Sequence, residues 1–140
     1  MKYRLATPAD CPLLAQLNHH LIRDEGHPNP MTVPELEERM CTWLATDYQA
    51  VIFTIDAEVV AYALYRDNGS EIYLQQFFVV RHRRREGIGR QAMRILFDNI
   101  WPKNKRLIVE VLWKNKPAVQ FWKAVGYEEH SLALEIPPQE

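Results

Sequence analysis

The sequence is short of cysteine and has no surplus of charge, and each shortage argues against a class of protein. Its 140 residues include two cysteines, Cys11 and Cys41, which lack the spacing of a zinc site. Both lie in segments expected to be helical, so we expect buried free thiols and a reducing compartment. Lys and Arg number 17 against 18 Asp and Glu, for a formal net charge of -1. This balance argues against a general nucleic-acid binder, so any attraction for phosphate must be local.

Long apolar runs are also missing. No stretch approaches the ~20 residues that a membrane-spanning helix needs, and no signal peptide opens the chain. The five histidines are scattered, so no metal site is expected. A length of 140 residues suits one domain, 1–140, that buries a core without disulfides or metals. We therefore expect a cytoplasmic, single-domain protein with no membrane partner.

Hydrophobic spacing and capping signals predict an α/β (α+β) chain with the order β-α-α-β-β-β-α-β-α-β. Two segments, Thr7-Pro8-Ala9-Asp10 and Thr32-Val33-Pro34-Glu35, carry an N-cap residue, an early proline and an acid at N3. Alternating or continuous apolar runs mark the strands, and glycine or proline ends most elements. The predicted strands are 2–6, 48–55, 58–66, 71–80, 107–112 and 128–136, and the predicted helices are 7–24, 32–45, 87–101 and 115–126.

The segment RHRRREGIGR, residues 81–90, follows a predicted strand and opens a predicted helix. A helix N-terminus with Gly87 and Gly89 suits a pyrophosphate, because its N–H groups are unpaired and no Cβ blocks the approach. The GK[ST] of a Walker loop is absent. Residues 87–92 fit the Rossmann pattern GxGxxA, with Glu110 about twenty residues on. However, the long basic stretch before the glycines and the short chain after them argue against that fold.

Two signatures in this order resemble those of the GCN5-related N-acetyltransferases. Arg84-Arg85-Glu86-Gly87-Ile88-Gly89 matches Q/R-x-x-G-x-G/A, and residues 115–127 resemble N-x-x-A-x-x-x-Y-x-x-x-G-F. The resemblance implies a single mixed, mostly antiparallel sheet flanked by about four helices. It also implies acetyl-CoA as cosubstrate and transfer of its acetyl group to an amine by direct attack in a ternary complex.

The resemblance also assigns roles to residues of this chain. Asn115 would contact the pantetheine, although it can equally be a simple helix N-cap. Among Arg81, Arg83 and Arg84, one or two would lie near the pyrophosphate or the ribose 3'-phosphate, and the others would be solvated. The backbone of the last strand residues would hold the pantetheine arm, and loop amides the pyrophosphate: Phe77, Phe78 and Val79 for the former, Arg85, Gly87, Ile88, Gly89 and Arg90 for the latter.

The catalytic groups depart from the family's pattern. Gln75 and Gln76 stand where many relatives carry an acid, so the resemblance points to Glu110 as the base, unless it merely faces solvent or an arginine. Expected mid-strand between Val109 and Val111, Glu110 would be partly desolvated, which raises a carboxyl pKa toward neutrality. Trp122 replaces the family's usual tyrosine and is no acid at accessible pH, so we expect it to pack against the coenzyme or in the core.

The acceptor site is expected beside the segment between the first two helices. Glu25 and His27 in that segment could receive an amine, but glycine and proline also make it an ordinary loop. The leading interpretation is an amine N-acetyltransferase acting on a small-molecule or protein amine. The alternatives are a catalytically weak acyl-CoA sensor on the same fold and, third, RNA binding by the arginine loop. The sequence leaves open whether the chain forms a homodimer.

Overall fold

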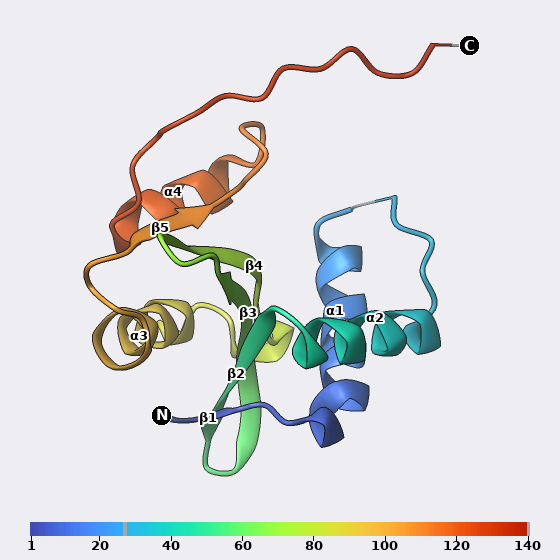
Figure 1. The fold of residues 1–140 in the computed structure, drawn as a ribbon, viewed down its shortest axis with the longest axis vertical. Coiled ribbons are helices and arrows are strands. Elements are labelled where there is room, and N and C mark those ends of the chain that lie inside the picture. The colour runs from blue at the N-terminus through green and yellow to red at the C-terminus, as the bar shows by residue number, and fades with distance from the viewer. Residues whose placement is uncertain (27, 140) are drawn as a thin grey trace. The chain divides into compact units, whose positions relative to one another are not determined.

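Residues 1–109 contain a five-stranded mixed sheet (Figure 1). The computed structural model describes residues 1–26 and 28–139. The strands lie in chain order, β1-β2-β3-β4-β5, and all neighbours are antiparallel except β4 and β5. This confirms the mixed, mostly antiparallel sheet and excludes the parallel sheet of the Rossmann interpretation. The bounds are β1 Lys2–Leu5, β2 Tyr48–Ile55, β3 Glu58–Asp67, β4 Glu71–Val79 and β5 Arg106–Val109.

The four predicted helices form. Local capping explains where α2 begins: the Thr32 backbone N–H donates to Glu35 Oε1 at 2.9 Å, and the Glu35 N–H donates to Thr32 Oγ1 at 3.3 Å. A single 3-10 turn, Pro8–Asp10, precedes the first helix, and a π-helical turn, Leu96–Ile100, continues the third. The helices are α1 Cys11–Asp24, α2 Val33–Ala45, α3 Ile88–Ile95 and α4 Lys116–Val125.

Residues Met1–Val109 form one compact unit, in which helices cover both faces of the sheet. Figure 1 shows α1 and α2 on one face and α3 on the other. The His20 ring of α1 lies 6.5 Å from that of Phe78, while Trp101, after α3, lies 5.4 Å from Tyr65. The largest fully buried side chains include Tyr62, Phe53, Leu14, Leu36, Met40 and Ile52.

The strand β4 changes its surroundings halfway along. Its first residues, Glu71 to Leu74, pair with β5, which ends opposite Leu74 at Val109. A bulge then shifts the register with β3, so that Leu74 faces Tyr65 but Gln76 faces Leu64. From Gln75 to Val79, β4 therefore has β3 on one edge and no pairing with β5 on the other.

The second compact unit, Glu110–Glu140, holds α4 and an irregular segment. Two predictions were wrong here. The strand expected at 107–112 stops at Val109, and residues 128–136 form no strand. The alternating residues that suggested this last strand are exposed: Leu132 by 67%, Leu134 by 86% and Ile136 by 84%. Alternation predicts a strand only when a neighbour covers one of its faces.

The two cysteines differ in exposure. Cys11 is buried as expected, and its burial raises the pKa of the thiol to about 12, with a further contribution from Cys41. Cys41 is exposed, which corrects the expectation of two buried thiols. Within the described residues, no helix has the length and apolar character to cross a membrane. The same residues bring no three His, Cys, Asp or Glu side chains together as a metal site.

Candidate functional site

The loop between β4 and α3 has a backbone shaped for an anion. Arg85 has φ = 67° and Gly87 has φ = 76°, both in the left-handed region. For Gly87 this conformation is easy, but for Arg85 it is strained, and such strain concentrates at functional sites. The first N–H of the α3 ladder is that of Gln91, which donates to the Gly87 carbonyl at 3.1 Å. The N–H groups of Ile88, Gly89 and Arg90 therefore precede the ladder, at the positive end of the helix.

Two arginines of this loop are tied to α1. Arg81 and Arg84 both pair with Asp24, the last residue of α1, and the Arg84 Nη2–Asp24 Oδ2 distance is 2.6 Å. Burial of Asp24 acts to raise the pKa of its carboxyl, but the hydrogen bonds from Arg81 and Arg84 outweigh it and the pKa is lowered. The carboxylate thus remains ionised at neutral pH, and it joins the end of α1 to the loop.

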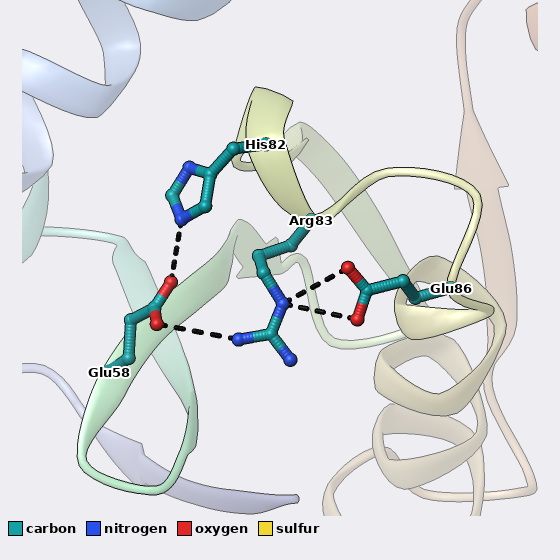
Figure 2. A network of polar contacts seen from close by, with 4 residues as sticks. All are labelled: Glu58, His82, Arg83 and Glu86. Atoms are coloured by element: carbon teal, nitrogen blue, oxygen red, sulfur yellow. Dashed lines mark hydrogen bonds and ion pairs between the residues drawn. The ribbon is translucent and has the colours of Figure 1, made fainter.

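A second acid, Glu58 at the start of β3, neutralises the middle of the loop (Figure 2). Its Oε1 lies 2.7 Å from His82 Nε2, and its Oε2 lies 3.4 Å from Arg83 Nη1. Arg83 Nε also contacts Glu86 Oε1 at 3.1 Å. Arg81, Arg83 and Arg84 therefore each have a carboxylate partner, and the Arg81 side chain is also 77% exposed to solvent.

Arg85 and Arg90 are the two basic residues of segment 81–90 that form no ion pair with any described residue. Both are exposed, and they flank the glycines at the start of α3. The positive charge that remains for a ligand is thus small and lies beside the strained backbone. This arrangement can hold a compact anion with two or three charges.

The end of β4 is held by Arg84. Its Nε donates to the Val79 carbonyl at 3.0 Å, and its guanidinium carbon lies 5.3 Å from the centre of the Phe78 ring. The Val80 N–H donates to Val60 of β3 at 2.9 Å. Because the N–H and C=O of one strand residue point to the same edge and successive residues alternate, those of Phe78 point to β3, whereas those of Phe77 and Val79 point to the other edge.

The α1 and α2 face of the sheet carries polar groups beside the same part of β4. The Tyr62 hydroxyl lies 2.9 Å from Gln76 Oε1, and the Tyr48 hydroxyl lies 3.3 Å from Gln75 Oε1. Burial strongly raises the pKa of Tyr62; the charge of Glu25 also raises it, and that of Arg39 lowers it. Glu25 is exposed just after α1, and His27 lies outside the described residues.

Sequence analysis missed a row of five side chains on this face, which we call the arginine–aromatic row: Arg39, Trp43, Tyr48, Arg66 and Tyr73. In it, Arg39 lies against Trp43, Trp43 against Tyr48, and Arg66 lies near both Tyr48 and Tyr73. They come from α2, β2, β3 and β4, so no local motif reveals them. The one available signal was that Arg66 and Tyr48 stand in segments predicted as strands.

The second unit contains the expected base and the second signature. Glu110 directly follows β5 and is exposed, and Val111 is 37% exposed, so the expected partial desolvation of the carboxylate is absent. The Asn115 side chain accepts a hydrogen bond from the Ala118 N–H at 3.3 Å, which makes it the N-cap of α4. The Trp122 ring packs 4.9 Å from Phe121 and 5.5 Å from Tyr127.

Comparisons with known proteins agree with this architecture. A family model described as an acetyltransferase (GNAT) domain matches residues 18–135. No curated protein matches the chain in sequence. The chain is similar to the structure of a "possible acetyltransferase" from Clostridium difficile 630, with a TM-score of 0.78, 18% identity and coverage of 99% of this chain and 97% of the other.

Two further structures have similar overlap. One is a "predicted acetyltransferase with acetyl-CoA" from Clostridium acetobutylicum, with a TM-score of 0.75, 19% identity and coverage of 97% and 95%. The other is the aminoglycoside acetyltransferase meta-AAC0020 from an uncultured soil metagenomic sample in complex with sisomicin, with a TM-score of 0.76, 16% identity and coverage of 99% and 96%. In both cases the first coverage refers to this chain.

Proposed function

Because the chain belongs to the family of GNAT acetyltransferase domains, we propose that it transfers the acetyl group of acetyl-CoA to a primary amine. The observation that carries this proposal is the loop at the start of α3. There, a strained Arg85, a left-handed Gly87 and the first N–H groups of the helix come together, and neither Arg85 nor Arg90 forms an ion pair within the described part of the chain. A pyrophosphate has the size and charge to complete such a site.

The coenzyme would be held at two places in the first unit. The N–H groups of Arg85, Gly87, Ile88, Gly89 and Arg90 would bind the pyrophosphate, with the side chains of Arg85 and Arg90 adding charge. We narrow the pantetheine contacts of β4 to Phe77 and Val79, because the backbone N–H and C=O of these two residues point away from β3, whereas those of Phe78 point toward it. Arg84 would act by positioning, since it holds both Asp24 and the Val79 carbonyl. Asn115 stays a proposed pantetheine contact.

Bound acetyl-CoA would supply the activated acetyl group, and the chain must supply a proton acceptor. An alkylammonium group has a pKa of ~10.4, so forming the neutral amine at pH 7 costs roughly 4 kcal/mol. Gln75 and Gln76 cannot accept the proton. We propose Glu110 as the acceptor, acting through water, which suits its exposed position.

Protonation of the leaving thiolate is proposed to come from solvent. Trp122 has no acidic proton at accessible pH. Burial raises the pKa of Tyr65 and of Tyr127, which makes both weaker acids. A thiol pKa of ~8.5 places thiolate release only about 2 kcal/mol uphill at neutrality, so no dedicated acid is required.

A non-catalytic acyl-CoA sensor is the second candidate. It is favoured by one observation, that Gln75 and Gln76 hydrogen-bond to tyrosines where an acid would serve catalysis. The deciding experiment is incubation of the purified chain with acetyl-CoA and a broad set of small-molecule amines and amine-bearing peptides, with release of free thiol as the readout. We expect amine-dependent thiol release. Tight acetyl-CoA binding without release for any amine would favour the sensor.

Coenzyme binding is tested separately with Gly89→Val, measured by calorimetry. We expect acetyl-CoA affinity to fall by at least ~100-fold, because the branched side chain occupies the phosphate's approach to the backbone. The matched control is Gln91→Val, which places the same residue in the same helix at an exposed position two residues later. Equal binding by both variants and the parent would contradict the proposed pyrophosphate site.

A further inference from the structure

The arginine–aromatic row runs without interruption across the α1 and α2 face of the sheet. The Arg39 guanidinium carbon lies 4.4 Å from the centre of the Trp43 ring, and the Trp43 and Tyr48 rings are 5.1 Å apart. The Arg66 guanidinium carbon then lies 5.8 Å from Tyr48 and 5.2 Å from Tyr73. The five side chains are each partly exposed, so the rings held between cations form a surface on which a small molecule can rest.

The two arginines of the row, Arg39 and Arg66, form no ion pair with any residue that the structure describes. Partial burial lowers the pKa of Arg39 and outweighs the opposing effect of Tyr62, so the charge is held at a net cost. By contrast, Arg81, Arg83 and Arg84 in the loop all have carboxylates. The row is therefore a local excess of positive charge in a chain with a net charge of -1.

Among the described residues, the covered side-chain atoms without hydrogen-bond partners on this face are all donors. Arg39 Nη2 donates to Asn18 Oδ1 at 3.1 Å, but Asn18 Nδ2, Arg39 Nε and Arg66 Nε are covered and have no acceptor among the described residues. Asn18 is buried, with an exposure of 1%. Covered donors without acceptors are costly, so the missing partner is a group rich in acceptor oxygens.

The row also reaches the reacting part of β4. Tyr48 within the row contacts Gln75, and the neighbouring Tyr62, on which Arg39 acts electrostatically, contacts Gln76. These two glutamines stand where β4 has lost its pairing with β5, next to the backbone of Phe77 proposed to hold the pantetheine arm. A molecule lying on the row would therefore present one end toward the thioester.

From this arrangement we propose that the acceptor is an amine that also carries a carboxylate, as amino acids do, and that Arg39 and Arg66 bind the carboxylate. Planar guanidinium groups suit a carboxylate, because two N–H groups can donate to its two oxygens. The aromatic rings between the arginines would contact the carbon skeleton. A purely cationic amine would be repelled by the same row. This inference rests on the proposed amine acetylation and specifies its substrate class.

The first test compares matched amines. Each α-amino acid of a panel is paired with the amine that remains when its carboxylate is removed, and thiol release from acetyl-CoA is measured for both. We expect kcat/KM to favour the carboxylated member of the best pair by about 10- to 100-fold. Arg66→Gln and Arg39→Gln should each remove most of that preference, whereas Arg94→Gln, on exposed α3 surface, should keep it.

The second test measures binding without turnover. Nitrogen-15 NMR follows the Nε–H signals of Arg39 and Arg66, assigned by their loss in the two Gln variants, during titration with both members of each pair in the presence of coenzyme A. We expect the carboxylated member to shift these signals. The decarboxylated member, and sodium chloride at equal ionic strength, should leave them unchanged. Thermal melting of each variant verifies that it folds. Arg39→Gln loses the hydrogen bond to Asn18, and if it does not fold, the test is made with Arg66→Gln alone.

The outcomes separate the two proposals. Equal or better turnover of the decarboxylated amines would overturn the carboxylate site and leave the acetyltransferase proposal intact. Absence of thiol release with every amine would contradict the proposed function. The NMR titration would then be the one test of the carboxylate-binding site. Unshifted arginine signals, or equal shifts with sodium chloride, would overturn the site in either case.

Discussion

Arg85 offers a substitution whose effects on stability and on coenzyme binding should have opposite signs. Its φ of 67° places an L-residue in the left-handed region, at a cost of ~1–2 kcal/mol. Glycine removes that strain but has more freedom in the unfolded chain, which costs ~0.5–1 kcal/mol. We therefore expect Arg85→Gly to raise the free energy of unfolding by up to about 1 kcal/mol.

The same substitution removes one of the two loop arginines that have no acid partner. Because Arg85 is exposed, its attraction for a pyrophosphate is screened and should amount to about 1 kcal/mol, which is roughly a fivefold loss of affinity for acetyl-CoA. The matched variant is Arg85→Gln, which removes the charge and keeps a side chain in the strained conformation. It should lose the same affinity and gain no stability.

Urea denaturation and calorimetry on the parent and both variants provide the measurements. If Arg85→Gly and Arg85→Gln prove equally stable, the backbone of residue 85 is not strained and the argument from its conformation is wrong. If both bind acetyl-CoA as tightly as the parent, Arg85 does not face the pyrophosphate. The affinity lost in the variants should also shrink at high salt, because an exposed charge causes it.

Three further predictions concern other parts of the chain. Asp10, whose pKa is lowered to about 2 chiefly by its hydrogen bond with Arg4, should stabilise the fold fully above pH ~4 and lose that contribution as the pH falls toward 2. Asp10→Asn should accordingly cost about 1 kcal/mol at pH 7, allowing for the exposure of Arg4, and should match the parent in acid, as measured by urea denaturation. Glu110→Gln should reduce turnover at neutral pH by ~10²-fold with acetyl-CoA affinity nearly unchanged, and much of the rate should return at high pH; a pH–rate profile like the parent's would rule out the assigned base. A disulfide-exchange reagent at pH 8 should modify Cys41 alone in the folded chain and Cys11 as well after denaturation, because burial raises the pKa of Cys11 to about 12; fast modification of both thiols in the native state would contradict the buried position.

Features encoded by neighbouring residues could be predicted from the sequence. The capping residues Thr32 and Glu35 place the start of α2 correctly, since their hydrogen bonds span three residues. The loop at the start of α3 was located in the same way. The charge balance of this loop could not be predicted, because the acids that pair with its basic residues are distant in the chain. Asp24 is 57 residues from Arg81, and Glu58 is 24 residues from His82.

The errors have a related physical cause. Residues 128–136 alternate as a strand does, but a strand also needs a neighbour, and no local pattern states whether one is present. Glu110 was expected inside a strand because apolar residues flank it, yet β5 ends one residue earlier. The arginine–aromatic row was missed for the opposite reason, since its members come from four elements and only the folded sheet brings them together.

The internal pairing of the arginine loop has a kinetic consequence. Asp24, Glu58 and Glu86 cancel much of the loop's charge within hydrogen-bonding distance, so little of its field extends past the ~8 Å over which physiological salt screens charges. An approaching anion is therefore guided only over the last few ångströms. The association rate constant for acetyl-CoA should change by no more than about threefold between low and physiological salt, unlike the steep dependence of electrostatically steered pairs. Within the described residues, a long polyanion such as RNA would find two loop arginines without an ion pair, Arg85 and Arg90, which is too few for the counterion release that sustains its binding.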